Sequence, residues 1–157
     1  MRIGLLSDTH DNLPKIEKAV KLFNQKKVDF VLHAGDFVAP FALDQFSKLS
    51  CEWLGVFGNN DGEKKGLTAK SQGRIRNAPL RIRLFGKKIT IIHDRTILDF
   101  KKEKADLIIF GHSHKAEIAR LLGKLIVNPG ECSGWLSGNS SVAVVDLETL
   151  EAKIFKV

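Results

Sequence analysis

Residues that can bind metal ions follow five short apolar segments of this 157-residue chain. The five groups are Asp8-Thr9-His10, Gly35-Asp36, Gly58-Asn59, His93 and Gly111-His112-Ser113-His114. In open α/β sheets, ligands bind beyond the carboxyl ends of the strands, so we expect the groups to meet in one cleft. They include four of the five histidines in the sequence. This concentration indicates a functional site and is not expected from chance scattering.

The candidate ligands share one kind of chemistry. They are carboxylate, amide and imidazole groups without cysteine, which favours Mn²⁺, Fe, Co²⁺, Ni²⁺ or Zn²⁺ over a thiolate centre. Seven side chains exceed the needs of one tetrahedral ion and suit two ions that share a bridging carboxylate: Asp8, His10, Asp36, Asn59, His93, His112 and His114. Two ions about 3.5–4 Å apart can generate a hydroxide nucleophile and stabilise phosphoryl displacement. Glycines 35, 58 and 111 are expected to let the chain turn sharply beside the ions, where a Cβ would crowd them.

Each candidate ligand also has a plainer interpretation when it is considered alone. Asp8 and Asp36 are suited to capping a helix or turn, Asn59 is suited to a turn, and His93 to a buried place in the core. Only the joint pattern favours a metal site over these alternatives. His33 ends an apolar run but matches none of the groups, so we interpret it as a packed histidine or a partner of a ligand.

The N-terminal part of the chain is predicted to alternate strands and helices. Apolar runs predict strands over residues 2–7, 28–32 and 51–57. Asn12 is a suitable N-cap, Pro14 suits a first helical turn, and apolar residues at helical spacing continue to about Gln25. A shorter helix is predicted over residues 41–49. This β-α-β-α-β order implies a parallel sheet with crossover helices.

The rest of the chain is predicted to be mostly antiparallel strand. Residues 62–77 contain three glycines and five basic residues, which indicates an exposed connection. Hairpins are predicted over 80–92, 117–128 and 141–157, with a buried strand over 106–110 and a helix around 95–103. The expected fold class is therefore α/β, with two packed mixed β-sheets flanked by helices, in a single domain spanning residues 1–157.

Composition limits the classes of partner and the location. The formal charge of +7 favours anionic partners, but no run of five basic residues occurs, so nucleic acid is only weakly supported. No apolar run reaches the ~20 residues needed to span a bilayer. Asp8 interrupts the first apolar run before a signal peptide can form, so we expect a cytoplasmic protein with no membrane partner. Cys51 and Cys132 are expected to be free thiols.

The five groups resemble the signature blocks of the calcineurin-like metallophosphoesterases. Their order and spacing resemble the small, single-domain bacterial and archaeal phosphodiesterase branch, and Asn128-Pro129-Gly130 resembles a further turn of that branch. The resemblance extends over essentially the whole chain. It implies the metallophosphoesterase four-layer sandwich, in agreement with the predicted strands.

The resemblance also implies a role for each ligand. One ion would be held by Asp8, His10, Asp36 and His114. The second would be held by Asp36, Asn59, His93 and His112, so that Asp36 bridges the two, and Mn²⁺ or Ni²⁺ is favoured. A hydroxide between the ions would attack phosphorus in line in a small phosphoester or nucleotide-like substrate.

Residues around the ligands are interpreted with the same resemblance in view. Larger relatives carry a histidine after the metal-binding asparagine, and here that position is Asn60, which cannot act as an acid near neutral pH. Asn60 is a weak candidate for a phosphate contact, and Asp61 is expected to orient a neighbouring ligand. Glu131, which follows the Asn-Pro-Gly turn, is assigned no chemistry.

Three functions remain open on the sequence. A metal-dependent phosphodiesterase or phosphatase is favoured because all seven ligand positions carry competent residues. A non-catalytic interaction scaffold is the alternative, since the same branch resembles the retromer-type vacuolar sorting subunit, in which the metal site is degraded. The positive charge leaves a nuclease as a third possibility. The oligomeric state is open: apolar residues such as Phe37, Phe41 and Trp135 would suit an interface and would equally suit the core.

Overall fold

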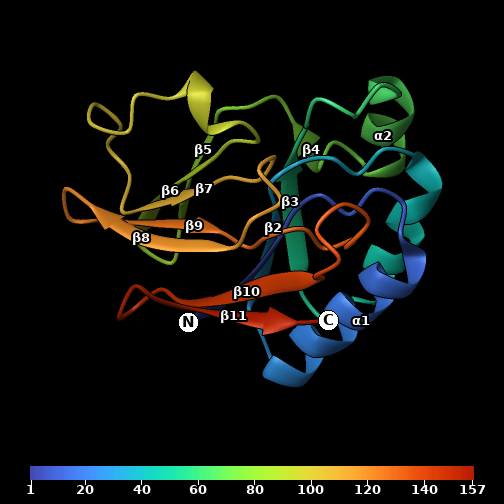
Figure 1. Cartoon of the computed structure of the whole chain (residues 1–157), viewed down its shortest axis with the longest axis horizontal. Helices are drawn as coiled ribbons and strands as arrows, with labels where there is room; N and C mark the ends of the chain where they lie inside the picture. The colour runs from blue at the N-terminus through green and yellow to red at the C-terminus, as the bar shows by residue number, and fades with distance from the viewer.

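The first of two β-sheets contains both ends of the chain. The computed structural model describes residues 1–157, and Figure 1 shows the two sheets facing each other. The six strands of the first sheet, in spatial order, are β11 (Glu151–Lys156), β10 (Ser141–Asp146), β1 (Arg2–Leu6), β2 (Phe30–His33), β3 (Glu52–Val56) and β4 (Ile75–Arg76). Strands β1 to β4 are parallel, as expected for the N-terminal part, whereas β10 and β11 add an antiparallel hairpin.

The second sheet has five strands and mixes both directions. Its spatial order is β5 (Leu80–Leu84), β6 (Lys87–Ile91), β7 (Leu107–Ile109), β9 (Lys124–Asn128) and β8 (Glu117–Leu121). The hairpins β5–β6 and β8–β9 form as predicted. Not all pairing in the C-terminal part is antiparallel, however, because β7 pairs in parallel with both neighbours, β6 and β9. The chain between β6 and β7 is long enough for such a crossover.

Period-2 alternation divides the apolar side chains between the faces of each sheet. On β1, Ile3 and Leu5 enter the core between the sheets, while Leu6 packs toward the helices. On β7, Leu107 and Ile109 face that same central core, and Ile108 faces outward. Strands buried on both faces explain why the sequence shows continuous apolar runs here rather than clean alternation.

Helices cover the outer face of the first sheet (Figure 1). Helix α1 (Leu13–Lys26) begins at the predicted cap, where the Asn12 side chain accepts a hydrogen bond from the Lys15 amide. The predicted helix over 41–49 is the 3₁₀ helix η1 (Pro40–Lys48). No helix here is both long enough and apolar enough to traverse a bilayer.

Two predicted segments differ from the structure. Residues 62–77 are not simply an exposed connection, because they contain helix α2 (Lys64–Lys70) and strand β4, which extends the first sheet. Leu67 provides the buried anchor, and one apolar residue among lysines gives too weak a periodicity to be recognised. The helix expected around 95–103 is also wrong, since only the 3₁₀ turn η2 (Arg95–Ile97) forms. This segment still covers the second sheet by burying Phe100 and Ala105.

Candidate metal centre

All five predicted ligand groups lie in loops that follow a strand. Asp8 and His10 follow β1, Asp36 follows β2, and Asn59 follows β3. The remaining groups, His93 and His112 with His114, follow β6 and β7 of the other sheet. Both sheets therefore direct the carboxyl ends of these strands toward the same edge of the sandwich. The five residue groups converge at that edge, as expected.

One set of side chains surrounds Asp8. Its Oδ1 lies 3.3 Å from His114 Nε2 and 3.9 Å from His10 Nε2. The ligand atoms of these three residues all lie within 4.8 Å of one another. The two imidazole rings are 5.4 Å apart between centroids. Such spacing suits a single ion held between a buried carboxylate and two histidines.

A second set gathers around Asn59. Its Oδ1 lies 2.9 Å from His93 Nε2 and 2.8 Å from His112 Nδ1. These two imidazole rings meet edge to face, with centroids 5.2 Å apart. The cluster of carboxylate and imidazole atoms that includes His93 also contains Asp36 and Asp8. Asp8 therefore borders both sets, which the sequence did not indicate.

Asp36 lies between the two sets. The same oxygen, Oδ2, is 3.5 Å from His10 Nε2 and 3.4 Å from His93 Nε2. Burial opposes ionisation, but hydrogen bonding and charge at His93, with two hydrogen bonds from Asn60, hold the pKa of Asp36 well below its usual range. An ionised carboxylate between the two histidine sets has the position that a bridging ligand requires.

Five of the predicted ligands have a left-handed backbone. Their φ angles are positive and lie between 39° and 65°, at Asp8, His10, Asp36, His112 and His114. Non-glycine residues adopt this region rarely and at a cost of about 1 kcal/mol or more each. Strain of this kind persists where the surrounding structure requires it and is concentrated at functional sites. The bends direct consecutive polar side chains into one cleft.

Several buried polar atoms in this cluster have no hydrogen-bond partner. They are Asp8 Oδ1, His10 Nε2 and His114 Nδ1, of which the last faces Glu131 at 3.4 Å and not Asp8. Burial also raises the pKa of Asp8 above its usual value, because an ion in a site with little water is poorly solvated. A cation beside Oδ1 would supply the missing partner and favour the ionised form. The residues present therefore fit a metal site on both their chemistry and their unmet bonding capacity.

The orientation of His93 is fixed in the way that metal-binding histidines require. Its Nδ1 lies 2.7 Å from the carbonyl oxygen of Ala34. A carbonyl oxygen can only accept, so Nδ1 carries the proton and donates it. Burial opposes protonation of this ring, but the hydrogen bond and charge of Asp36 raise the pKa of His93. Loss of the Nε2 proton when a cation binds would leave the Nε2 lone pair free, as it is when a backbone carbonyl orients a metal ligand.

Asp61, which was expected to orient a ligand, and Asn60, which was a candidate for a phosphate contact, both hydrogen-bond to the region of Asp36. Asp61 accepts hydrogen bonds from the backbone amides of Asp36, Val38 and Gly58 through its two oxygens. Asn60 donates from its side chain to Asp36 Oδ2 at 2.7 Å and from its amide to Oδ1 at 2.8 Å. Asp61 thus holds the loop that carries Asp36, and Asn60 holds the carboxylate itself. A direct contact between Asn60 and phosphate stays a prediction.

His33 is a packed residue next to the site. Its ring is stacked on Phe37 with centroids 3.6 Å apart, and its Nδ1 accepts from the Gly35 amide. Nε2 lies 3.1 Å from the Thr9 hydroxyl oxygen. Burial lowers the pKa of His33 well below its usual value, so the ring is held neutral. Of the three apolar residues considered for an interface, Phe37 is buried here, while Phe41 and Trp135 are exposed.

Sequence reasoning missed Glu131. Its carboxylate is fully buried and lies 3.4 Å from the Nδ1 of His114. Burial opposes ionisation, but hydrogen bonds from Ser137, Leu136 and Ser133 outweigh it and lower the pKa of Glu131 to about 2. Carboxylates in this position orient metal-binding histidines. A charged residue directly after an Asn-Pro-Gly turn was the only available signal.

Asn128 supports the opposite side of the same histidine loop. Its side-chain amide donates to the Gly111 carbonyl at 3.0 Å and to the Ser113 hydroxyl at 2.9 Å. The resemblance of Asn128-Pro129-Gly130 to a family turn therefore has a structural basis. Asn128 therefore holds the loop between β7 and β8, which carries His112 and His114.

The predicted role of the glycines needs a correction. Among Gly35, Gly58 and Gly111, only Gly35 has a positive φ, of 100°, so a sharp turn does not explain all three. At Gly58 a Cβ would collide with the backbone and carboxylate of Asp36, and at Gly111 with the side chains of Ser7 and Asp8. Glycine is needed because the ligand loops pack directly against one another, which leaves no space for a side chain.

The two cysteines contribute nothing to this centre. Both are free, as predicted. Cys132 is buried, and burial raises the pKa of its thiol to about 12, so it is not a nucleophile.

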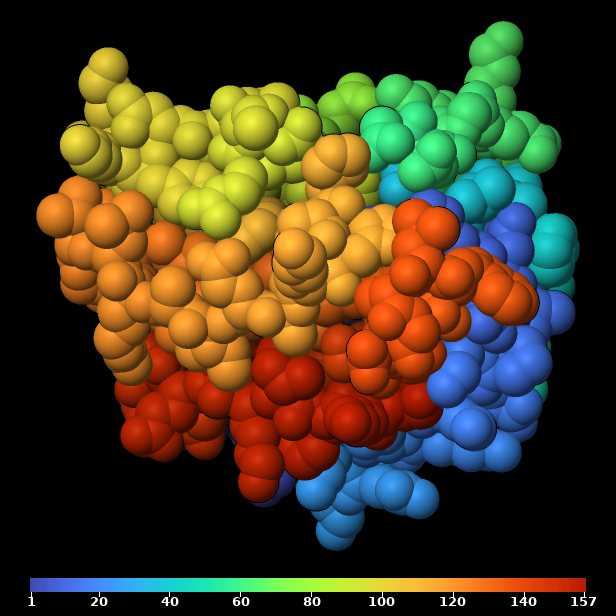
Figure 2. All heavy atoms as spheres, in the orientation of Figure 1, coloured from blue at the N-terminus to red at the C-terminus, as the bar shows by residue number.

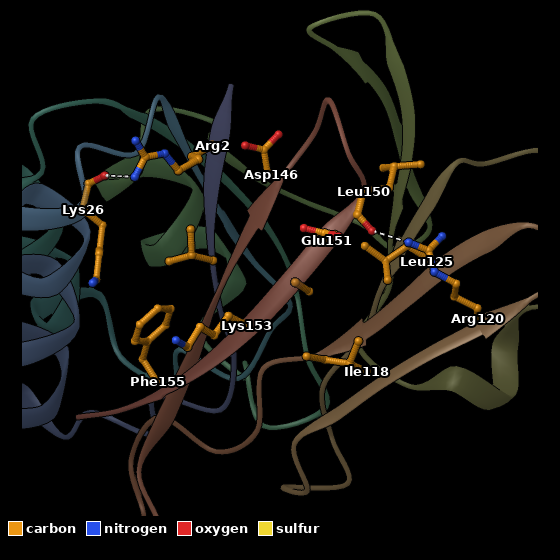
Figure 3. A pocket seen from close by; sticks show the side chains of 12 residues that line it. Arg2, Lys26, Ile118, Arg120, Leu125, Asp146, Leu150, Glu151, Lys153 and Phe155 are labelled. Carbon is orange, nitrogen blue, oxygen red and sulfur yellow. Dashed lines mark hydrogen bonds between the residues drawn. The ribbon is translucent and has the colours of Figure 1, made fainter.

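A large cavity lies away from the candidate ligands. It has a volume of about 770 Å³ and is bordered by residues of the outer strands β8 and β11, together with Arg2 and Lys26. Figure 3 shows two hydrogen bonds beside this cavity, from the Arg2 side chain to the Lys26 carbonyl and from the Arg120 side chain to the Leu150 carbonyl. The acidic side chains of Asp146 and Glu151 also line this cavity, together with these basic residues. It contains no grouping of metal ligands, and size alone does not make it the reactive site.

A smaller cleft of about 490 Å³ lies at the candidate metal centre. Its lining includes Asp36, Asn59, His112 and His114. A sandwich of two mixed sheets with these carboxylates, amide and imidazoles beyond its strand ends defines a metal-dependent hydrolase. More particularly, the chain belongs to the calcineurin-like phosphoesterase superfamily, whose domain model matches residues 1–150.

Individual relatives agree with this assignment. The chain is 36% identical to a phosphodiesterase of Methanocaldococcus jannaschii over 96% of each protein. The solved structure of an archaeal phosphodiesterase superposes with a TM-score of 0.94, at 33% identity and over the full length of both chains. Vps29 from Entamoeba histolytica in complex with zinc has a TM-score of 0.72 over 100% of this chain and 98% of its own, but at 21% identity it shows the fold alone.

Proposed function

We propose that the protein is a two-metal phosphodiesterase that hydrolyses a small phosphoester. The observation that carries this proposal is the position of Asp36, whose Oδ2 lies 3.5 Å from His10 Nε2 and 3.4 Å from His93 Nε2. One ligand would be shared by two ions, with Asp8, His10 and His114 on one side and Asn59, His93 and His112 on the other. The archaeal relative named as a phosphodiesterase supports a diester substrate.

The chain's own residues would prepare the site before the substrate arrives. Divalent ions bound there would supply Lewis-acid stabilisation of phosphate charge and would make a water molecule acidic enough to act as the nucleophile. Asp36 provides the negative charge between the two ligand sets, and Asn60 fixes the orientation of its carboxylate. The backbone carbonyl of Ala34 and the carboxylate of Glu131 set the ring orientations of His93 and His114. In the hydrolysis, water oxygen attacks phosphorus in line and the opposite ester P–O bond breaks.

The leaving group would depart without a protein acid beside Asn59. Asn60 occupies that position, and its side-chain amide already donates to Asp36. An amide does not transfer protons near neutral pH. We therefore propose that leaving groups of low pKa are preferred, and that others take their proton from water. Mn²⁺ and Ni²⁺ are the proposed ions.

The test is hydrolysis of bis(4-nitrophenyl) phosphate and 4-nitrophenyl phosphate after metal removal and add-back. We expect the stripped protein to be inactive and divalent ions to restore turnover, with the diester preferred. Asp36→Ala should reduce the rate to background, because both ions lose a ligand. Restored activity in Asp36→Ala would contradict the shared ligand. The absence of turnover with every ion would reject the enzyme and favour the scaffold.

We also propose a cytoplasmic location and a homo-oligomer. The nuclease alternative predicts that nucleic-acid affinity falls steeply with salt concentration, since the charge of +7 would act on phosphates.

A further inference from the structure

A short loop places an apolar side chain at the edge of the metal cleft. Leu136 is 81% exposed, the highest value among the large apolar side chains. It is the only hydrophobic residue in the lining of the cleft of about 490 Å³. The loop runs between Gly134 and Gly138, whose φ angles are +70° and +68°. Figure 2 shows this orange part of the chain on the surface, against blue atoms of the N-terminal region.

This loop is bonded to the neighbourhood of two metal ligands. The amides of Leu136 and Ser137 donate to the two carboxylate oxygens of Glu131, at 2.9 Å and 2.7 Å. The same carboxylate lies 3.4 Å from Nδ1 of His114. On the preceding residue, the Trp135 indole N–H donates to the His10 carbonyl at 3.2 Å. The loop is therefore positioned relative to His10 and His114, which belong to one ligand set.

An exposed leucine alone would need no explanation. Here the backbone amide of Leu136 is held by a hydrogen bond to a buried carboxylate that also faces His114. The cleft also exceeds the space that a phosphate group needs, and its other lining residues are polar. Ligand sites commonly combine a few polar groups that fix orientation with an apolar surface that contacts the organic part.

On the basis of the proposed phosphodiesterase function, we infer that Leu136 is the apolar contact for one ester group of the substrate. The substrate class would be phosphoesters that carry an uncharged, aryl-sized apolar group. The phosphate would lie against the metal ligands, and the organic group would extend toward Leu136. Glu131 is the positioning residue for this contact, because it holds both amides of the loop.

The test compares two non-hydrolysable ligands, phenylphosphonate and methylphosphonate, on the Mn²⁺-loaded protein. They present the same phosphonate and differ only in the organic group. Covering part of a leucine side chain should make phenylphosphonate bind about fivefold more tightly. Calorimetry measures this ratio directly, and competition against bis(4-nitrophenyl) phosphate measures it during turnover. Leu136→Ala should bring the ratio close to one.

A matched control is available at Leu122, which is 65% exposed in the turn between β8 and β9. Leu122→Ala should leave the phenyl preference unchanged. Glu131→Gln should reduce the preference for phenylphosphonate and accelerate amide hydrogen exchange at residues 136 and 137. Loss of a carboxylate that only stabilised the fold would not accelerate exchange selectively at these two amides. The inference is wrong if the wild type shows no preference for phenylphosphonate, or if Leu136→Ala keeps it. Binding of both phosphonates without turnover of any ester would instead reject the proposed function.

Discussion

The buried carboxylate of Glu131 contacts both the proposed metal ligand His114 and the loop beside the cleft, so its replacement by glutamine tests how the centre is held. One oxygen accepts from the Ser133 hydroxyl at 2.8 Å and the Leu136 amide at 2.9 Å. The other accepts from the Ser137 amide at 2.7 Å and faces His114 Nδ1 at 3.4 Å. Glutamine keeps the shape but replaces one acceptor oxygen with an NH₂ group. In either orientation, a donor then faces a donor.

The expected magnitude follows from that loss. An unsatisfied buried donor costs about 1–3 kcal/mol, and loss of a carboxylate that orients a metal-binding histidine reduces metal affinity by about 10- to 100-fold. We expect Glu131→Gln to remain folded at room temperature but to bind Mn²⁺ about 10- to 100-fold more weakly. Calorimetric titration of the stripped protein measures the affinity, and thermal unfolding confirms that the variant is folded.

Glu52→Gln is the matched control for this measurement. Glu52 lies at the start of β3, is 71% exposed in its side chain, and pairs with Arg74 at 3.3 Å. The start of a parallel strand is far from the edge where the ligands gather, so Mn²⁺ affinity should not change. Wild-type affinity in a folded Glu131→Gln variant would refute the role assigned to Glu131.

Two further predictions concern stability. Leu67→Ala should destabilise the fold by about 2–4 kcal/mol, because Leu67 is the buried anchor of α2. Chemical denaturation measures this loss of unfolding free energy. A change below about 0.5 kcal/mol would mean that α2 is not packed against the sheet. The second prediction concerns Glu103, whose pKa is lowered by hydrogen bonding from Arg81. Ionised Glu103 therefore stabilises the folded state above its unfolded pKa, and this stabilisation is lost as the pH falls through its folded pKa. Glu103→Gln should therefore cost a few tenths to about 1 kcal/mol at pH 7. Urea unfolding at pH 7 and pH 3 should show the two proteins converging in acid, and a constant difference would contradict the assigned cause.

The local signals in the sequence were sufficient for most strands and for the seven candidate ligands. Apolar runs ending in Asp8, Asp36 or His93 depend only on the residues themselves, and strand-end geometry then predicts convergence. Hairpins such as β5–β6 were predictable because a tight turn joins neighbouring strands. Helix α1 was predictable because its cap and apolar face are encoded within a few turns.

Only the tertiary structure decided the pairing of β7 with β6 and β9, since parallel partners are separated by long stretches of chain. It also decided the left-handed backbone at the ligands, because surrounding contacts, and not local preference, hold that conformation. Glu131 acquires its role only when a loop some 17 residues beyond His114 folds back onto it. The identities of the candidate ligands are therefore local properties of the sequence, whereas their support and spacing depend on contacts between distant segments.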